Sequence, residues 1–417
     1  MTLSEELRYR GFVNQTTYKD LSALDGEPIT FYFGVDPSAD SMQIGNLAAA
    51  MMVRHFINYG HKAVLLVGGA TGMIGDPDGK KDERNLKTLD EIARNKAAIA
   101  EQYRQVFSGQ AFDIVDNYDW FKDLGYLAFL REVGKHVPMR QMLGRDFVQA
   151  RLGIDGSGIS YAEFSYSLIQ GYDFVHLFRE KGVTLQVCGA DQWGNSIAGV
   201  DLIRRLEGKE AHVYSVPLII NKATGKKFGK SEDGAVWLDP AKTSAYKFYQ
   251  FWLNLDDEGV EDYLKVYTLL SKEEIERIIA EWNENRGGRL AQKTLAWEVT
   301  KLVHGEETAG SVRHITGALF GDTDYASLSP SEFGLLAEEL PKFQFAHDNN
   351  SIDMLYEILI ATSLASSKTE ARRFVEAGAV YWNGEKVTSE TNLNGFIHGC
   401  AIIRRGKNQN ALIVTGK

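Results

Sequence analysis

The sequence has few cysteines and no long apolar run. Its only cysteines, Cys188 and Cys400, lie far apart and offer neither a metal-ligand spacing nor a disulfide framework, so we expect a reducing, cytoplasmic setting and no structural metal. No segment approaches the roughly 20 consecutive apolar residues that a membrane-spanning helix needs, and residues 1–11 lack the apolar core of a signal peptide. We therefore expect neither export nor membrane insertion.

Positive charge is scarcer than negative charge. The chain carries 46 basic and 56 acidic residues, a net charge of −10. A nucleic-acid partner would have to be held by local basic patches, because the overall charge repels it. The rest of the composition, with 44% hydrophobic and 24% charged residues among 417, is typical of soluble globular proteins and suffices for a large core with one or two smaller domains.

Apolar runs alternate with amphipathic segments in the first part of the chain. The periodicity predicts strands at 30–35, 63–69, 112–117, 183–191 and 212–220 and helices at 47–59, 90–107, 161–180 and 196–206. Continuous apolar strands are typical of parallel strands that are buried on both faces. We predict an α/β fold with a doubly wound, Rossmann-like parallel sheet, whose ligands bind outside the carboxyl ends of the strands.

The pattern changes after the last of these strands. Helical, charged segments follow, then a looser stretch with Pro330 and Pro341, then short helices paired with glycine-punctuated strands. We predict a Rossmann-like domain over 1–242, a helical domain over 243–324, a linker over 325–351 and a small α+β domain over 352–417.

The first candidate site is the stretch TFYFGVDPSADSMQIGN, residues 30–46. A β-rich run ends at Asp36 and Pro37, and Gly45 stands where an apolar periodic segment begins. This order of strand, tight loop and helix presents unpaired backbone N–H groups at a helix N-terminus, where phosphate can bind. Gly34 and Gly45 allow a ligand to approach the backbone closely.

The second candidate site is TGKKFGKSEDGAVWLD, residues 224–239. Lysines alternate with glycines, and Ser231 follows, in a loop that can approach a polyanion closely. The pattern differs from that of a P-loop. It favours a loop that binds a triphosphate without the P-loop arrangement. A solvated basic turn is an equally good interpretation of these residues alone.

Five motifs, in order, carry a resemblance to a known family. TFYFGVDPSADSMQIGN and KFGKS, together with GGATGMIGDP, FSYSLIQGYDF and GADQWGN, resemble the tyrosyl-tRNA synthetases of bacteria, which are class I aminoacyl-tRNA synthetases. The resemblance runs over essentially the whole chain. It implies a homodimer, joined through surfaces around residues 118–165, that activates L-tyrosine with ATP and Mg2+ and transfers it to the 3′ end of tRNA(Tyr).

The resemblance also implies a tyrosine pocket. In it, Tyr32 and Asp173 would contact the substrate phenol, while Asp76, Tyr166 and Gln170 would hold the α-ammonium group. The full implied set is Tyr32, Asp36, Asp76, Tyr166, Gln170, Asp173 and Gln192. The spacing of residues 166, 170 and 173 places them on one helical face, so ordinary packing is the alternative interpretation of that face.

For ATP, the resemblance implies a backbone cradle, a ribose acceptor and polar side chains that stabilise the leaving pyrophosphate. The implied ATP-binding set is Gly34, Gly45, Gln186, Gly189, Asp191 and Lys230. The implied catalytic set is Ser38, Gln43, Asn46, Lys80, Arg84, Lys227, Lys230 and Ser231. As bare sequence, the basic run at Lys80 and Arg84 is also consistent with a solvated charge run, and Asp191 with a helix N-cap.

QIGN departs from the family's first signature, which is His-Ile-Gly-His. Gln43 and Asn46 can donate hydrogen bonds to phosphate, but neither can become cationic. Phe33 likewise stands where the family often has a cysteine, and it loses a side-chain hydrogen bond. These departures leave a second class of function open beside the tyrosine–tRNA ligase, a noncatalytic RNA-binding paralogue. A tyrosyl donor for a small-molecule pathway is a third.

Basic residues gather in the last predicted domain, although the whole chain is acidic. This segment resembles the small RNA-binding domain that these synthetases share with ribosomal small-subunit proteins and pseudouridine synthases, so we expect its basic residues to contact tRNA phosphates. The set is Lys368, Arg372, Arg373, Lys386, Arg404, Arg405 and Lys407. An exposed helix face of ordinary charge is the alternative interpretation.

Overall fold

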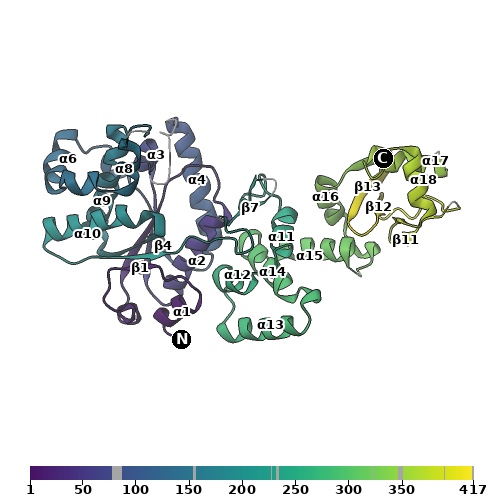
Figure 1. The fold of residues 1–417 in the computed structure, drawn as a ribbon, viewed down its shortest axis with the longest axis horizontal. Coiled ribbons are helices and arrows are strands. Elements are labelled where there is room, and N and C mark those ends of the chain that lie inside the picture. The colour runs from purple at the N-terminus through teal and green to yellow at the C-terminus, as the bar shows by residue number, and fades with distance from the viewer. Residues whose placement is uncertain are drawn as a thin grey trace. The chain divides into compact units, whose positions relative to one another are not determined.

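The chain forms two compact units (Figure 1). The N-terminal unit comprises residues 1–244 and 251–303, and the C-terminal unit comprises residues 245–250 and 304–417. Within the residues that the structure describes, no helix is both long and apolar enough to cross a membrane. The computed structural model describes residues 1–77, 87–153, 156–226, 228–231, 234–321, 323–345, 351–388 and 390–415.

A six-stranded sheet forms the core of the N-terminal unit, with the strand order β1-β6-β5-β2-β3-β4. Strands β2 to β6 run parallel, and β1 pairs antiparallel with β6 at the edge. The strands are β1 (Gln15–Thr16), β2 (Thr30–Val35), β3 (Lys62–Val67), β4 (Phe112–Asp116), β5 (Val183–Gly189) and β6 (His212–Val216). Every strand predicted from the apolar runs is present, and the predicted doubly wound α/β fold is confirmed.

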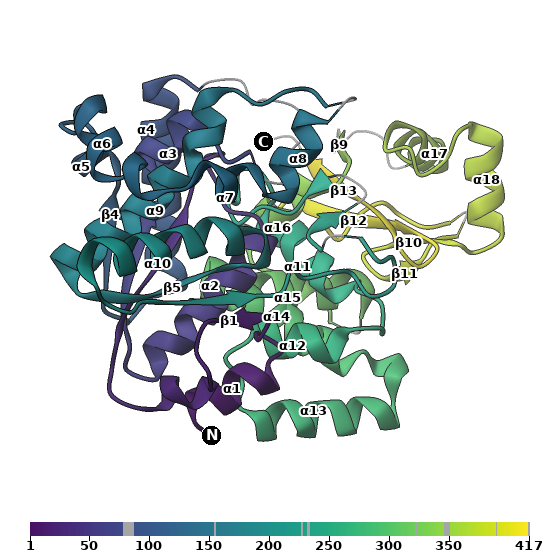
Figure 2. The ribbon, with the colours of Figure 1, turned by 60° about the vertical axis from the view of Figure 1, so that its left-hand side comes forward.

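Helices cover both faces of this sheet (Figure 1, Figure 2). α2 (Ile44–Asn58) and α4 (Leu89–Val106) pack on one face, and α9 (Tyr161–Lys181) and α10 (Trp193–Glu207) pack on the other. Neighbouring residues of β2 point to opposite layers. The Phe33 ring lies 6.5 Å from that of Tyr103 in α4, whereas the Tyr32 ring lies 5.2 Å from that of Phe174 in α9. Tyr32 and Phe33 therefore belong to different layers.

Short helices fill the connection from β4 to α9, and the apolar periodicity does not predict them. They are α5 (Tyr118–Phe121), α6 (Tyr126–Glu132), α7 (Met139–Leu143) and α8 (Asp146–Leu152). Each spans only one or two turns, which is too short for a clear amphipathic period. This segment carries large apolar side chains that are more than half exposed, namely Tyr126, Leu127, Met139 and Leu152.

The N-terminal unit also contains a short hairpin and further helices, one at the start of the chain, one after β3 and three after α11. The hairpin pairs β7 (Lys230–Ser231) with β8 (Gly234–Ala235). α11 (Ala245–Leu253) contributes residues to both units. The helices are α1 (Leu3–Tyr9), α3 (Gly69–Ile74), α12 (Val260–Tyr267), α13 (Lys272–Glu284) and α14 (Leu290–His304).

The C-terminal unit is built on a five-stranded sheet with the order β11-β10-β12-β13-β9. One face packs against α17 and α18 around Trp382 and Ile403, and the other packs against α15 and α16 around Ile402 and Leu412. Its elements are α15 (Glu306–Phe320), α16 (Pro330–Glu339), β9 (Lys342–Phe345), α17 (Ile352–Ala361), α18 (Lys368–Glu376), β10 (Val380–Trp382), β11 (Glu385–Lys386), β12 (Cys400–Arg405) and β13 (Gln409–Thr415).

The segment expected to be a linker, 325–351, contains regular structure instead. Pro330 begins α16, where Ser329 and Glu332 form a capping box, and β9 pairs in parallel with β13. A proline in the first helical turn removes an N–H group that has no partner in the helix anyway. Pro330, which was placed in a looser stretch, therefore marks a helix start.

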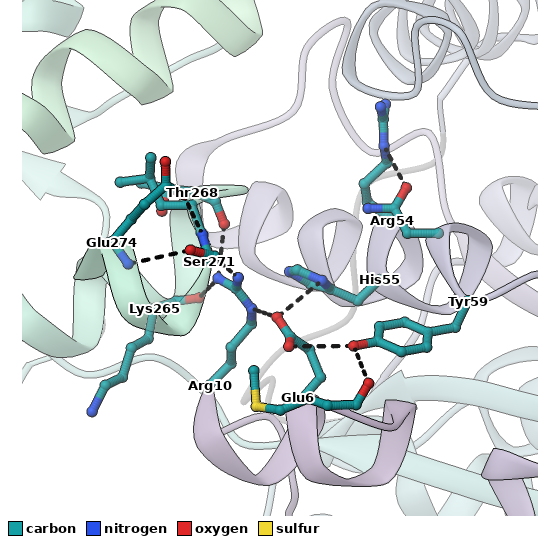
Figure 3. Close-up of polar contacts among 12 residues, drawn as sticks. Glu6, Arg10, Arg54, His55, Tyr59, Lys265, Thr268, Ser271 and Glu274 are labelled. Atoms are coloured by element: carbon teal, nitrogen blue, oxygen red, sulfur yellow. Dashed lines mark hydrogen bonds and ion pairs between the residues drawn. The ribbon is translucent and has the colours of Figure 1, made fainter. Parts of the chain in front are cut away.

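A buried arginine joins α1 to the far end of α12 (Figure 3). The Arg10 guanidinium donates to the backbone carbonyls of Lys265, Thr268 and Leu270 at 2.6, 2.9 and 2.6 Å, and its Nε donates to Glu6 at 2.5 Å. These carbonyls lie at the C-terminus of α12, where a helix lacks donors and favours a cation. Arg10 is only 2% exposed.

His55 of α2 and Tyr59, the residue that follows α2, complete this junction. Tyr59 donates to Glu6 at 3.4 Å, and His55 Nδ1 lies 3.8 Å from the Glu6 carboxylate. Burial lowers the pKa of His55 to about 3, and the charges of Arg10 and Arg54 add to the effect. His55 is thus a neutral packing residue at pH 7, and the charge of Glu6 is balanced by Arg10.

We expect Arg10→Met to lower the free energy of unfolding by about 3 kcal/mol, because it leaves the buried Glu6 carboxylate without its cation. Urea unfolding measures the change. Arg8→Met, an exposed arginine of the same helix, serves as the control and should change stability by less than about 0.5 kcal/mol. Adding Glu6→Gln to Arg10→Met should recover part of the loss, and equal effects of Arg8→Met and Arg10→Met would contradict this role.

Candidate active site

The candidate site lies where the winding of the sheet reverses. From β2 the chain builds the sheet in one direction through β3 and β4, while β5 and β6 lie on the other side of β2. The crossover helices consequently cover opposite faces, and a crevice is expected outside the carboxyl ends of β2 and β5. Asp36 follows β2 directly, and Asp191 lies just after β5. The fold thus brings together motifs that are about 150 residues apart in the sequence.

Acidic side chains converge on the hydroxyl of Tyr166. This hydroxyl donates to Asp36 Oδ2 at 2.8 Å. Burial raises the pKa of Tyr166, and the charges of Asp36, Asp76 and Asp173 raise it further. Asp76 in turn accepts a hydrogen bond from Gln192 Nε2 at 2.5 Å. This end of the site therefore has a negative potential, which suits a cationic group.

Asp173 is a buried carboxylate that the protein holds from both sides. It is 1% exposed, and it accepts from Asn117 Nδ2 at 3.1 Å and from Trp120 Nε1 at 3.0 Å. Burial raises the pKa of Asp173, and these hydrogen bonds oppose the rise because they favour the charged form. The carboxyl group is thus fixed in place and remains a strong acceptor.

Buried oxygen atoms next to these carboxylates lack a hydrogen-bond partner among the described residues. They are Tyr32 Oη, Gln170 Oε1 and Gln186 Oε1. Tyr32 and Gln186 are direct partners across β2 and β5, and Gln170 shares α9 with Tyr166 and Asp173. An unsatisfied buried polar atom costs about 1–3 kcal/mol. A ligand that supplies hydrogen-bonding groups here would remove that cost.

The two glycine-containing signatures lie side by side at the start of α2. Ile44 N donates to Val236 O at 3.1 Å, and Val236 N donates to Gly229 O at 3.1 Å. Gly229 has a φ of +104° and lies so close to Ile44 that a Cβ would be 3.0 Å from its side chain. Only glycine combines that backbone conformation with this close approach.

An aromatic cluster anchors the second signature. Phe228 stacks on Tyr263 with ring centroids 4.4 Å apart, and it also contacts Trp252 and Tyr267 at 5.8 and 5.7 Å. Because Phe228 is only 4% exposed, it fixes one end of the lysine-rich loop against α11 and α12. The loop therefore has a rigid support beside the N-terminus of α2.

Gln43 and Asn46, two residues of the first predicted signature, are hydrogen-bonded to each other at the start of α2. The backbone N–H of Gln43, the N-cap residue, donates to Asn46 Oδ1 at 3.0 Å. Asn46 thus accepts at its oxygen as part of the helix cap, which leaves its Nδ2 group as a donor. Ser38 and Asp191 are exposed near the same strand ends.

Several predicted residues fall outside what the structure describes. Lys80, Arg84 and Lys227 lie outside the described residues. Lys230 and Ser231 form β7, and only their backbone is described. Phe33 is described, and its ring packs against Tyr103 rather than toward the carboxylates around Tyr166. Phe33 is therefore a core residue of the α4 layer.

Asn117 and Trp120 are site residues that the sequence interpretation missed. Asn117 is fully buried and links three segments, because it also accepts from Ala70 N at 2.7 Å and donates to Thr71 Oγ1 at 3.1 Å. It directly follows β4, at the same edge of the sheet as Asp36. A search for polar residues that directly follow predicted strands would have found it.

The predicted RNA-contacting residues of the C-terminal unit divide between the two faces of its sheet. Arg404 lies over the Tyr381 ring at 4.3 Å, and Lys386 pairs with Tyr381 across β10 and β11. Arg405, the next residue, points to the opposite face and lies over Phe374 of α18 at 4.6 Å. The remaining basic residues of the set, Lys368, Arg372, Arg373 and Lys407, are exposed.

Fold and site together define a nucleotide-using enzyme of the doubly wound α/β class, and family comparisons agree. The model for class I tRNA synthetases of the W and Y type matches residues 24–321. The model for the tyrosine–tRNA ligase SYY-like C-terminal domain matches residues 332–413. The chain therefore belongs to the tyrosine–tRNA ligase family of class I tRNA synthetases.

Individual relatives support this membership. The chain is 44% identical over 427 residues to a tyrosine–tRNA ligase of Geobacillus kaustophilus, and the match covers 99% of each chain. A tyrosine–tRNA ligase of Geobacillus stearothermophilus matches equally well, at 44% identity over 99% of each chain. Among solved structures, a C-terminally truncated mitochondrial tyrosyl-tRNA synthetase of Aspergillus nidulans aligns with a TM-score of 0.68 and 29% identity, over 75% of this chain and 92% of the other.

We expect Tyr32→Phe to stabilise the ligand-free protein by about 1 kcal/mol, because the removed hydroxyl is buried without a partner. The same change should weaken binding of a ligand that offers a hydroxyl at this position. Urea unfolding without ligand is the measurement. The control is Tyr214→Phe, whose buried hydroxyl donates to Phe12 O at 2.8 Å and whose loss should destabilise by a similar amount. If both changes destabilise equally, Tyr32 is not a ligand-binding group.

Proposed function

We propose that this chain is a tyrosine–tRNA ligase with an active adenylation site. It joins L-tyrosine to ATP, which gives tyrosyl-adenylate and pyrophosphate, and then transfers the tyrosyl group to the 3′ end of tRNA(Tyr). The observation that carries the proposal is the set of buried, unsatisfied polar groups beside Asp173 and Tyr166. These groups are arranged as a small, polar amino-acid ligand with a phenol would require.

The acidic end of the site would bind the α-ammonium group of the substrate. Asp36 and Asp76 are the carboxylates that act on the Tyr166 hydroxyl. A cation placed among them would replace the mutual repulsion of the carboxylates by attraction. Gln170 and Gln192 add amide groups to the same end, and Gln192 already holds Asp76.

The buried end of the site would bind the substrate phenol. Asp173 accepts hydrogen bonds, and the Tyr32 hydroxyl both donates and accepts, so together they can satisfy a para-hydroxyl group completely. Phenylalanine would enter the same space, leave the Tyr32 hydroxyl unpaired and place an apolar ring edge against the Asp173 carboxyl group. Discrimination against phenylalanine therefore follows from the cost of that desolvation.

Activation requires no protein nucleophile. The carboxylate of tyrosine attacks the α-phosphorus of ATP, the bond to the β-phosphate oxygen breaks, and pyrophosphate leaves with the electron pair. Catalysis then consists of positioning the reactants and stabilising the charge on the leaving group. ATP enters as its Mg2+ complex, so we treat the ion as part of the substrate.

The N-terminus of α2 and the loop beside it would hold the phosphates. Backbone N–H groups at a helix N-terminus bind phosphate, and Gln43 and Asn46 supply neutral donors there. The basic residues would add positive charge around the pyrophosphate; they are Lys80, Arg84, Lys227 and Lys230, with the hydroxyl groups of Ser38 and Ser231. Gly34, Gly45, Gln186, Gly189 and Asp191 would contact the rest of the nucleotide.

Transfer of the tyrosyl group needs tRNA, which the basic residues of the C-terminal unit would contact at its phosphates. Arg404 beside Tyr381 and Arg405 beside Phe374 also offer cation and aromatic surface, which suits nucleic acid. We further propose a cytoplasmic homodimer. The exposed apolar side chains of α6, α7 and α8 are the surface that would join the two copies.

Tyrosine-dependent exchange of labelled pyrophosphate into ATP tests the proposal. We expect the native chain to catalyse exchange, and we expect Gln43→Leu to reduce its rate about tenfold, which corresponds to the loss of one neutral hydrogen bond. The KM for tyrosine should stay unchanged, since Gln43 acts at the phosphates. Gln43→His should be at least as fast as the native chain.

Gln105→Leu, which removes an exposed glutamine from α4, is the control and should leave the exchange rate unchanged. Exchange by Gln43→His but not by the native chain would favour the noncatalytic RNA-binding paralogue, because it would show that QIGN has disabled the site. The absence of exchange in both would contradict the ligase.

A further inference from the structure

A chain of hydrogen bonds leads from the short helices after β4 into the acidic end of the site. Arg145, the residue before α8, donates from Nη1 to Asn195 Oδ1 at 2.6 Å. Asn195 Nδ2 donates to Gln192 Oε1 at 3.2 Å, and Gln192 Nε2 donates to Asp76 Oδ2 at 2.5 Å. Each side chain in this series therefore orients the next.

The direction of this series is set at its two ends, Arg145 and Asp76. A guanidinium group can only donate hydrogen bonds, whereas the amides of Asn195 and Gln192 can donate at one end and accept at the other. Because Arg145 requires an acceptor, Asn195 turns its oxygen toward Arg145 and its N–H groups toward Gln192. Gln192 turns its own N–H groups toward Asp76, whose carboxylate can only accept, so the position of Asn195 between the two ends depends on Arg145.

Burial makes this dependence strong. Asn195 is 3% exposed, so water does not supply alternative partners for its amide. Arg145 is further fixed by donating from Nη2 to the backbone carbonyl of Gly194 at 2.9 Å. Without Arg145, Asn195 Oδ1 would lose its donor in a buried position, and Asn195 would no longer be held where it donates to Gln192, the side chain that supports Asp76.

We propose that Arg145 is a positioning residue for the α-ammonium group of tyrosine, acting through Asn195 and Gln192 on Asp76. The inference rests on the proposed function, because it assigns the ammonium group to Asp76. Arg145 touches no substrate in this arrangement. Its effect is to keep Asp76 in place, and with it the part of the tyrosine affinity that depends on the ammonium group.

The test compares two ligands that differ only in that group. Equilibrium binding of L-tyrosine and of 3-(4-hydroxyphenyl)propanoate, which lacks the ammonium group, is measured by calorimetry without ATP. We expect Arg145→Met to weaken tyrosine binding about tenfold and to leave binding of the propanoate unchanged within about twofold. Arg145→Lys keeps a cationic donor and should retain most of the tyrosine affinity.

Asn195→Asp separates this role from a structural one. Its carboxylate still accepts from Arg145 and forms an ion pair, so the fold should be retained, but it has no N–H group to donate to Gln192. Gln192 would then lie between two carboxylates that both require its N–H groups, which weakens its hydrogen bond to Asp76. We therefore expect the same selective loss of tyrosine binding as in Arg145→Met, without a loss of thermal stability.

Arg140→Met, which removes an exposed arginine of the neighbouring α7, is the matched control and should bind both ligands as the native chain does. An equal loss for both ligands in Arg145→Met and Asn195→Asp, or no loss for either, would overturn the assignment while the native chain still binds tyrosine. Failure of the native chain to bind tyrosine would instead overturn the proposed function and the assignment with it.

Discussion

The reversal of winding between β2 and β5 is the constraint on which the whole site depends. Because the crossover helices of neighbouring strands lie on opposite faces, the carboxyl ends of these strands are not covered by a connecting helix. Asp36 and Asp191 follow the carboxyl ends of β2 and β5 at this point. Helix α9, which carries Tyr166 and Asp173, packs against the same part of the sheet. The polar groups meet there because the strand order brings the ends of β2, β4 and β5 to the same edge of the sheet.

The polar groups of the site lower the stability of the ligand-free protein. Asp173 is a buried carboxylate whose hydrogen-bond donors, Asn117 and Trp120, are neutral, and Tyr32, Gln170 and Gln186 keep buried oxygen atoms without a partner among the described residues. Such groups destabilise a fold unless a ligand completes them. The junction at Arg10 contrasts with this arrangement, because each buried charge there has a direct partner. What distinguishes the site is that three unsatisfied oxygen atoms, those of Tyr32, Gln170 and Gln186, lie on β2, β5 and α9, of which β2 and β5 pair with each other and α9 carries Tyr166 and Asp173.

Much of the fold could be predicted from the sequence, and the elements that were missed were missed for physical reasons. Continuous apolar runs placed the parallel strands, because strands that are buried on both faces need them. The helices α5 to α8 were missed, since each is too short to show a period, and α16 was placed in a linker because a proline in the first turn of a helix resembles a proline in a loop. Arg145 and Asn195 carried no local signal, because their roles arise only from contacts across some 50 residues of sequence.

The site could be predicted from the sequence mainly through resemblance. Strand ends pointed to Asp36 and Asp191, but only the family's pattern suggested roles for Tyr32, Gln170 and Asp173. Those roles stay predictions, although the unsatisfied oxygen atoms and the convergence of carboxylates on Tyr166 support them. The substitutions at Gln43 and Asn46 affect the phosphate end, which is separate from the amino-acid pocket, so the two halves of the site can be examined independently.

Binding of L-tyrosine and of L-phenylalanine to the native chain, without ATP, tests the central claim most directly. The claim is that Tyr32 and Asp173 form a pocket for a para-hydroxyl group. We expect tyrosine to bind with a measurable heat and phenylalanine to show no binding at the same concentrations, because phenylalanine leaves the Tyr32 hydroxyl unpaired and offers Asp173 no donor. Similar affinity for the two amino acids, or no binding of tyrosine, would contradict the account.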